Sequence, residues 1–227
     1  MRRWVRRLGT ALVVLGVLVL AWSFVVWRWQ DPFTALYTKL EQHRLAGQYA
    51  TVQREFHAKR VTGGTLAERR QIAAEAQRYR ASVHRGQAIG RIVVPRLHLS
   101  MVLVNGTDHD SLKRGPGRYP GSFMPGQGRL VYVAGHRTTY LAPFSHIDSL
   151  RPGDLITIQV PYGSFVYVVR SHRIVAASDV AVLRSPDHEV VILQACHPRF
   201  FATHRYLVYA YPVRVVPANG KAFSVSG

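Results

Sequence analysis

The chain has 227 residues, of which 48% are hydrophobic, a single cysteine and a formal net charge of +18 at pH 7. This length accommodates one substantial domain and an appendage. One cysteine excludes an intramolecular disulfide framework and any zinc site built from several thiolates. Basic residues exceed acidic ones by five to none in residues 1–30, ten to five in 31–90 and fifteen to seven in 91–227. Such an even spread predicts attraction to anionic surfaces, such as a membrane or an acidic polymer, and argues against a nucleic-acid partner.

The N-terminal part contains an uncharged run of twenty residues, 8–27, between Arg7 and Arg28. A helix of this length spans the ~30 Å hydrocarbon core of a bilayer. Four arginines within the first seven residues predict a cytoplasmic N-terminus and an extracytoplasmic remainder. The alternative is a cleaved signal peptide, but the apolar run is long and no Ala-x-Ala site follows it. We therefore expect a basic cytoplasmic N-terminus at 1–7 and a single-pass anchor in the cell membrane at 8–27.

Residues 28–88 differ in composition from the segments on either side. Apolar residues recur at helical spacing near the start of this segment, Gly63 and Gly64 interrupt the pattern, and residues 66–79 are rich in helix-forming side chains. We expect a helical stalk with one break that lifts the next domain off the membrane. A partly disordered linker is the alternative interpretation.

From residue 89 to 227 the sequence changes to short β-type runs separated by glycine and proline. The strands that this pattern predicts are 89–94, 99–104, 130–134, 155–160, 165–172, 190–194 and 206–216. One helical turn is expected at 108–112, and the Gly- and Pro-rich residues 114–121 are expected to form a shaped loop. The domain is therefore predicted to be all-β, a small barrel or sandwich with short helices.

The only cysteine, Cys196, ends the run Val-Val-Ile-Leu-Gln-Ala-Cys at 190–196 and is followed by Pro198, which stops strand pairing. A lone cysteine is commonly a small buried hydrophobic residue. A thiol at a strand end can also be a nucleophile, which needs a base or a cation nearby and a path to solvent. The residue types around it decide between these interpretations.

Among the histidines, His136 has a position like that of Cys196, because it follows the predicted strand 130–134 and Gly135. Two polar residues at adjacent strand ends can face one cleft, although a loop histidine taken alone is more often an ordinary surface residue. His197 adjoins the cysteine, and on a strand it points to the opposite face. Arg205 begins the strand after Cys196, so its guanidinium can return to the thiol and stabilise an oxyanion. Arg199 is nearer in sequence but lies within the loop.

Four segments together resemble the sortases. They are Gly-Pro-Gly-Arg-Tyr-Pro-Gly-Ser at 115–122, Ala-Gly-His-Arg-Thr-Thr-Tyr at 134–140, Leu-Gln-Ala-Cys-His-Pro at 193–198 and Arg-Tyr-Leu-Val-Tyr-Ala at 205–210. Their order and spacing match over about residues 88–216, and the histidine and cysteine contexts resemble class E sortases of high-GC Gram-positive bacteria. The resemblance implies an eight-stranded sortase β-barrel and a cysteine transpeptidase. In that family Cys196 corresponds to the nucleophile, His136 to the general acid and base, and Arg205 to the oxyanion or substrate clamp.

The resemblance also implies two partners and no cofactor. The substrates are secreted proteins with a Leu-Pro/Ala-x-Thr-Gly signal near their C-terminus, cut between Thr and Gly, and the acceptor is an amine of a peptidoglycan precursor. One departure concerns Ala195, where the family usually has threonine; we interpret the missing hydroxyl as a lost contact near the substrate threonine. A calcium site is not indicated, because the seven carboxylates in 91–227 are scattered.

Three other functions remain open from the sequence. A cysteine hydrolase on the same fold would use water in place of the amine. A non-catalytic module that binds the cell wall or a polyanion would use the positive charge, and its binding would weaken steeply with salt. Zinc binding through Cys196 and nearby histidines is the third, although no close pair such as His-x-x-x-His is present.

Overall fold

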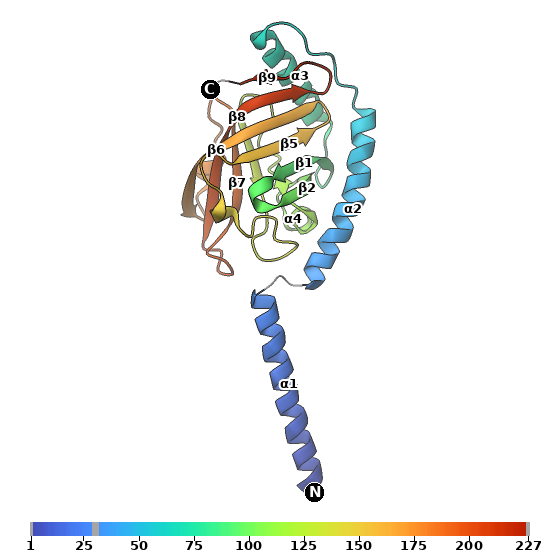
Figure 1. The fold of residues 1–227 in the computed structure, drawn as a ribbon, viewed down its shortest axis with the longest axis vertical. Helices are drawn as coiled ribbons and strands as arrows, with labels where there is room; N and C mark the ends of the chain where they lie inside the picture. The colour runs from blue at the N-terminus through green and yellow to red at the C-terminus, as the bar shows by residue number, and fades with distance from the viewer. Residues whose placement is uncertain (1, 29–31, 226–227) are drawn as a thin grey trace.

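The structure is a computed structural model that describes residues 2–28 and 32–225, and its side chains are described for 2–24 and 33–225. The helices are α1 (Arg2–Arg28), α2 (Pro32–Glu55), α3 (Thr65–Ser82) and α4 (His109–Arg114). The first of them contains a segment, Arg2–Phe24, that is long and apolar enough to cross a membrane, and its side chains are exposed. Figure 1 shows α1 leading away from a barrel, with α2 along one side of that barrel and α3 at its far end.

The barrel is formed by eight strands that close on themselves. The barrel strands are β1 (Ala88–Val94), β2 (Leu99–Asn105), β3 (Gly117–Arg118), β4 (Leu130–Ala134), β5 (Leu155–Val160), β6 (Gly163–Ala176), β7 (Val190–His197) and β8 (His204–Pro217). A short additional strand, β9 (Phe223–Ser224), follows them. Their order is β6-β5-β1-β2-β3-β4-β7-β8, the pairing of β8 with β6 closes the ring, and β9 extends one edge of β8. The all-β fold that the strand pattern predicts and the eight-stranded barrel that the resemblance implies are confirmed.

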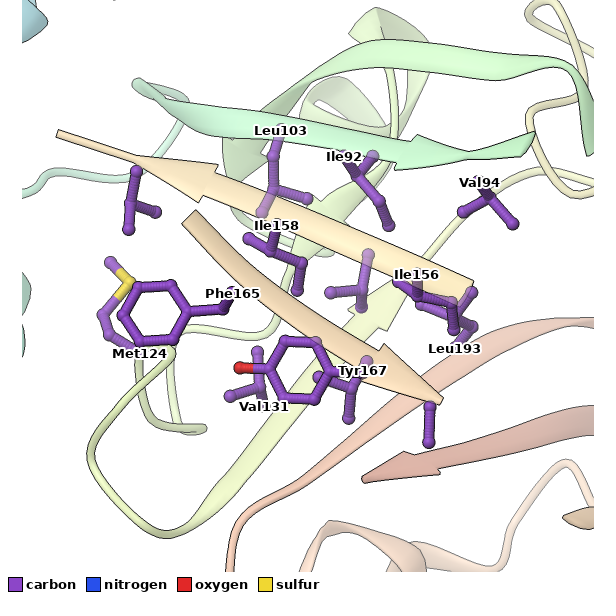
Figure 2. Close-up of a cluster of buried hydrophobic side chains, with 14 of the residues drawn as sticks. Ile92, Val94, Leu103, Met124, Val131, Ile156, Ile158, Phe165, Tyr167 and Leu193 are labelled. Carbon is purple, nitrogen blue, oxygen red and sulfur yellow. The ribbon is translucent and has the colours of Figure 1, made fainter. Parts of the chain in front are cut away.

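Alternation along the strands divides their side chains between an interior apolar cluster and apolar clusters on the outer face. Inside the barrel, Ile156, Ile158, Phe165 and Tyr167 point at the same core as Leu193 (Figure 2). The second cluster lies on the outer face and comprises Leu130, Tyr132, Val175, Val190, Ile192 and Leu207. The loop between β6 and β7, with its short helix Val180–Leu183, covers that face through Val182 and Leu183. The outer face of β4, β7 and β8 is therefore partly closed to solvent.

Two differences from the expected strands have local causes. The Gly- and Pro-rich loop contains β3, whose glycine packs so close to Gly106 that an added Cβ at Gly117 would lie 1.9 Å from the Gly106 carbonyl oxygen. Strands β6 and β8 are 14 residues each and longer than predicted, because they pair with each other along their whole length and exposed polar residues are tolerated on that ribbon.

The helices between α1 and the barrel form as expected, but they pack on the barrel and do not lift it away as a stalk would. Leu45 and Tyr49 of α2 are buried against Ala88, Val102 and Val104 on the outside of β1 and β2. The reason is that β2 is apolar on both faces, so its outer face needs a cover. Helix α2 provides that cover.

Helix α3 packs just as closely on the far end of the barrel. Its buried residues Ile72, Ala76 and Tyr79 belong to the same cluster as the barrel interior. The Tyr79 hydroxyl donates a buried hydrogen bond of 2.9 Å to the carbonyl oxygen of Ile89. The helix therefore closes one end of the barrel core.

Candidate active site

Strand register brings His136, Cys196 and Arg205 to neighbouring positions. Strands β4 and β7 are parallel, and their pairing runs from Leu130 beside Val190 to Ala134 beside Gln194. Continuing this register by two residues places His136 beside Cys196. On the other side of β7, Cys196 is directly opposite Arg205 of β8. Neighbouring strands lie about 5 Å apart, so the three residues form one row across three strands.

The row lies on the outer face of the barrel. Ala195 is fully buried in the interior cluster, so the next residue, Cys196, points outward, and its side chain is half-buried. Because Ala195 points into the core, the hydroxyl that it lacks would not face a substrate held beside Cys196. The interpretation of Ala195 as a lost substrate contact is therefore not supported.

His136 is held at the end of β4 by its neighbours. The Gly135 amide donates to the Gln194 carbonyl at 3.0 Å, and the Phe144 amide donates to the His136 carbonyl at 3.1 Å. A Cβ on Gly135 would lie 2.6 Å from the Phe144 ring, so this position requires glycine. The close approach of Phe144 fixes the start of the loop that carries the imidazole.

The imidazole of His136 has a buried Nε2 with no hydrogen-bond partner in the part of the chain that the structure describes. Its ring packs on Tyr140 with centroids 5.1 Å apart. Burial, and to a lesser degree the positive charge of His109, lower the pKa of His136 below its usual value. A buried ring nitrogen without a partner is suited to accept a proton from a bound reactant or to return one to it.

The loop after His136 has an unusual backbone. Tyr140, Leu141 and Ala142 all have positive φ values of 54°, 59° and 38°. A residue in this left-handed conformation costs about 1–3 kcal/mol of folding free energy, and it persists only where surrounding contacts hold it in place. Helix α2 provides a support, because the Tyr140 amide donates to the Thr34 hydroxyl at 3.2 Å and Tyr37 packs edge-on against the Tyr140 ring at 6.4 Å.

Arg205 donates through Nη1 to the carbonyl oxygens of Ala202, at 2.8 Å, and His204, at 3.0 Å. These bonds fix the guanidinium at the start of β8. Among the described residues, Nε and Nη2 of Arg205 make no hydrogen bond, so one edge of the fork is available to an anionic oxygen. Arg199, the alternative, is exposed in the loop that follows β7.

Sequence reasoning missed Arg137, which is buried beside the site. Its Nη1 donates to the Cys196 carbonyl at 3.3 Å and to Nδ1 of His197 at 3.0 Å, and its Nη2 pairs with Asp148 at 2.7 Å. Arginine can only donate, so Nδ1 of His197 is an acceptor and carries no proton. His197 thus takes part in a structural contact on the opposite face from Cys196. The only signal for Arg137 in the sequence is its adjacency to His136, and its burial depends on Asp148 from a later turn.

A cleft of about 330 Å³ lies further along the outer face of β7 and β8, and Cys196 is not among its lining residues. Its walls include Val190 and Ile192 of β7, Tyr209 and Tyr211 of β8, and Val182 of the covering loop. An extended peptide can lie along such an apolar, partly covered strand face. In residues 2–28 and 32–225, no three His, Cys, Asp or Glu side chains lie close enough together to hold a metal ion.

Several known proteins are similar to this chain in fold and in sequence. A family model described as a sortase domain matches residues 92–213, more than half of the chain. Sortase D of Bacillus subtilis is 31% identical over 128 residues, which cover 55% of this chain and 63% of that protein. Sortase SrtE1 of Streptomyces coelicolor is 28% identical over 163 residues, or 64% of this chain and 46% of that protein. The crystal structure of Sortase E1 from Streptomyces coelicolor, with a tripeptide in its active site, is 27% identical with a TM-score of 0.55, over 58% of this chain and 91% of that chain. The match therefore spans less than two thirds of either curated relative.

Proposed function

The chain belongs to the sortase family of cysteine transpeptidases, and we propose that it cleaves a C-terminal sorting signal and transfers the acyl product to an amine of the cell wall. The observation that carries the proposal is that Cys196 lies directly opposite Arg205, while His136 follows β4 two residues after the last pairing of β4 with β7. The proteins similar to this chain include class E sortases, as the resemblance in the sequence predicts, and a class D sortase. The signal motif, the acceptor and the roles of the three residues are parts of this proposal.

In the first half of the reaction, the sulfur of Cys196 attacks the carbonyl carbon of the substrate threonine. Negative charge develops on the carbonyl oxygen, where the guanidinium of Arg205 stabilises it. His136 protonates the nitrogen of the following glycine, the C–N bond breaks, and the glycine fragment leaves as an amine. The threonine acyl group remains on Cys196 as a thioester.

In the second half, an amine attacks the thioester carbonyl. His136 removes the proton that the amine loses, and the C–S bond breaks to return the Cys196 thiolate. The buried Nε2 of His136 and the packing of Tyr140 on its ring limit the access of water to the histidine.

The acyl donor is a protein with a Leu-Pro/Ala-x-Thr-Gly signal, held as an extended segment along the cleft beside β7. The chain itself sits in the cell membrane through α1, with the barrel on the extracytoplasmic side. Support for this placement comes from the apolar segment Arg2–Phe24 and from the arginines at its start. The acceptor is an amine of a peptidoglycan precursor, which is present on that side.

In the direct test, the full chain in detergent is incubated with a peptide that contains Leu-Ala-x-Thr-Gly. An excess of a diamino acid is added as the amine acceptor. We expect mass spectrometry to find the peptide cut after threonine and joined to the amine, and we expect no product with Cys196→Ala. Products that end in a free threonine carboxylate despite excess amine would identify a hydrolase. No turnover by the parent chain would exclude both enzymes and leave the binding module, and turnover by Cys196→Ala would exclude Cys196 as the nucleophile.

A further inference from the structure

The end of the barrel that carries the reaction centre is also the end nearest the anchor. Parallel β4 and β7 both finish there, so the loops after His136 and Cys196 emerge at the same end. Thr34, at the start of α2, is hydrogen-bonded to the first of these loops at Tyr140. The rings of Trp22 in α1 and Phe33 in α2 lie 5.9 Å apart, so α1 ends beside the same region (Figure 1).

Several large apolar side chains at this end are exposed. In the first turns of α2, Leu36 is 59% and Leu40 is 58% exposed, although Leu45 further along the helix is fully buried. In the loop between β7 and β8, Phe200 is 57% and Phe201 is 77% exposed. Adjacent exposed phenylalanines at a loop tip are unfavourable in water and are typical of a contact surface.

The charge around these residues is positive. Lys39 lies between the two leucines, and Arg199 directly precedes the two phenylalanines. In the part of the chain that the structure describes, neither Lys39 nor Arg199 forms an ion pair. Three acids at this end are paired: Glu41 with Arg44 and Arg114, Asp110 with Lys113, and Asp148 with Arg137. Asp179, which follows β6 beside the start of β8, forms no ion pair among the described residues.

We propose that Leu36, Leu40, Phe200 and Phe201 form a membrane-facing rim that inserts into the interfacial layer of an anionic bilayer. The inference rests on the anchoring by α1 under the proposed function. Apolar side chains flanked by basic ones are the composition of surfaces that bury about 5–10 Å into the headgroup region, and each basic residue adds attraction to anionic lipids. The two leucines are four residues apart on the helix and so lie on one side of it, about 6 Å apart along the axis.

Insertion of the rim selects substrates by the distance of their cleavage site from the membrane. Phe201 is five residues after Cys196 in the sequence, so insertion of its loop holds the thiol close to the lipid surface. The rim therefore favours substrates in which the Thr–Gly bond lies just outside a membrane-spanning segment of the substrate. A bond presented far from the bilayer, on a long tether, would be disfavoured when the enzyme is in a membrane.

The test uses the full chain in nanodiscs of phosphatidylcholine and phosphatidylglycerol. In a Cys196→Ser background, Phe201→Cys or Leu36→Cys supplies a single thiol for an NBD fluorophore. The matched control is Leu66→Cys, which is 72% exposed at the start of α3, at the opposite end of the barrel. We expect blue-shifted NBD emission and severalfold stronger quenching by nitroxide-labelled lipid at positions 201 and 36 than at 66. We also expect that Arg199→Gln weakens the quenching at 201.

Equal quenching at positions 201, 36 and 66, in a chain that co-purifies with the nanodiscs, would overturn the rim and favour a protein partner for this surface. A chain that fails to co-purify would overturn the anchor and the rim together. Catalysis is measured separately on soluble peptide in detergent, so loss of the proposed activity is distinguished from loss of the rim. In that assay Phe201→Ser should match the parent, whereas in nanodiscs it should turn over a membrane-tethered substrate more slowly.

Discussion

Replacing Ile72 by alanine tests whether α3 belongs to the folded barrel. Ile72 is fully buried in the interior cluster, and its Cγ2 atom lies so close to Gly126 that a Cβ there would approach it to 2.5 Å. The change removes three carbon groups, each worth about 0.8 kcal/mol of burial. Ile72 also borders a cleft of about 1010 Å³ between α3 and the barrel, so the space left opens into the cleft and is not a closed void. We therefore expect a loss of about 2–3 kcal/mol, in the lower part of the range for such changes.

For a folded region of this size, that loss lowers the midpoint of thermal unfolding by about 5–10 °C. The measurement is the near-ultraviolet circular dichroism of the tyrosines of the full chain in detergent, because the tryptophans are all in the first 29 residues. The matched control is Leu66→Ala in the same helix, where the leucine is exposed and the expected change is within about 0.5 kcal/mol. Equal midpoints for Ile72→Ala and Leu66→Ala would show that α3 is a detached stalk and would refute the packing argument.

Three further predictions concern the reaction centre. Arg205→Lys keeps the charge but loses the planar fork, and we expect kcat to fall by about 10²-fold, as for a missing oxyanion donor; a change of less than about threefold would remove Arg205 from this role. His136→Ala should nearly abolish cleavage because the glycine amine then leaves without a proton. His197→Ala should keep much of the activity, and the reverse pattern would transfer the acid role to His197. His109→Gln removes a positive charge that lowers the pKa of His136, so the decline of kcat/KM as His136 loses its proton should move to higher pH. An unchanged or lower midpoint would contradict that assignment.

The barrel could be predicted because most of its strands have a hydrophobic pattern that is visible in the local sequence. Runs such as 155–160 and 190–194 alternate or are apolar throughout, and Gly and Pro separate them, so local sequence was sufficient. The candidate residues were predicted from strand ends, since Cys196 and His136 both follow apolar runs. Their alignment could not be read in the same way. It depends on the parallel register of β4 and β7, which joins residues 60 apart in sequence.

The packing of α2 and α3 could not be predicted for a different reason. Part of the contact between α2 and the barrel is polar. Gln42 exchanges hydrogen bonds with the backbone of Val102, and the fully buried Thr38 donates to the Lys113 carbonyl at 2.7 Å. Such residues interrupt the apolar stripe that indicates a packed helix. Conversely, Leu36 and Leu40 continue a helical apolar spacing but remain exposed, so the pattern alone did not show which side meets the barrel.

The central claim is that Cys196 carries the substrate as a thioester. The most direct measurement is the intact mass of the full chain after brief incubation with a sorting-signal peptide, without amine and with an acid quench. We predict an added mass equal to that of the peptide fragment that ends in threonine less one water, located on Cys196 by fragmentation and released by hydroxylamine. Cleavage of the peptide with no adduct on Cys196, or an adduct on another residue, would contradict the account.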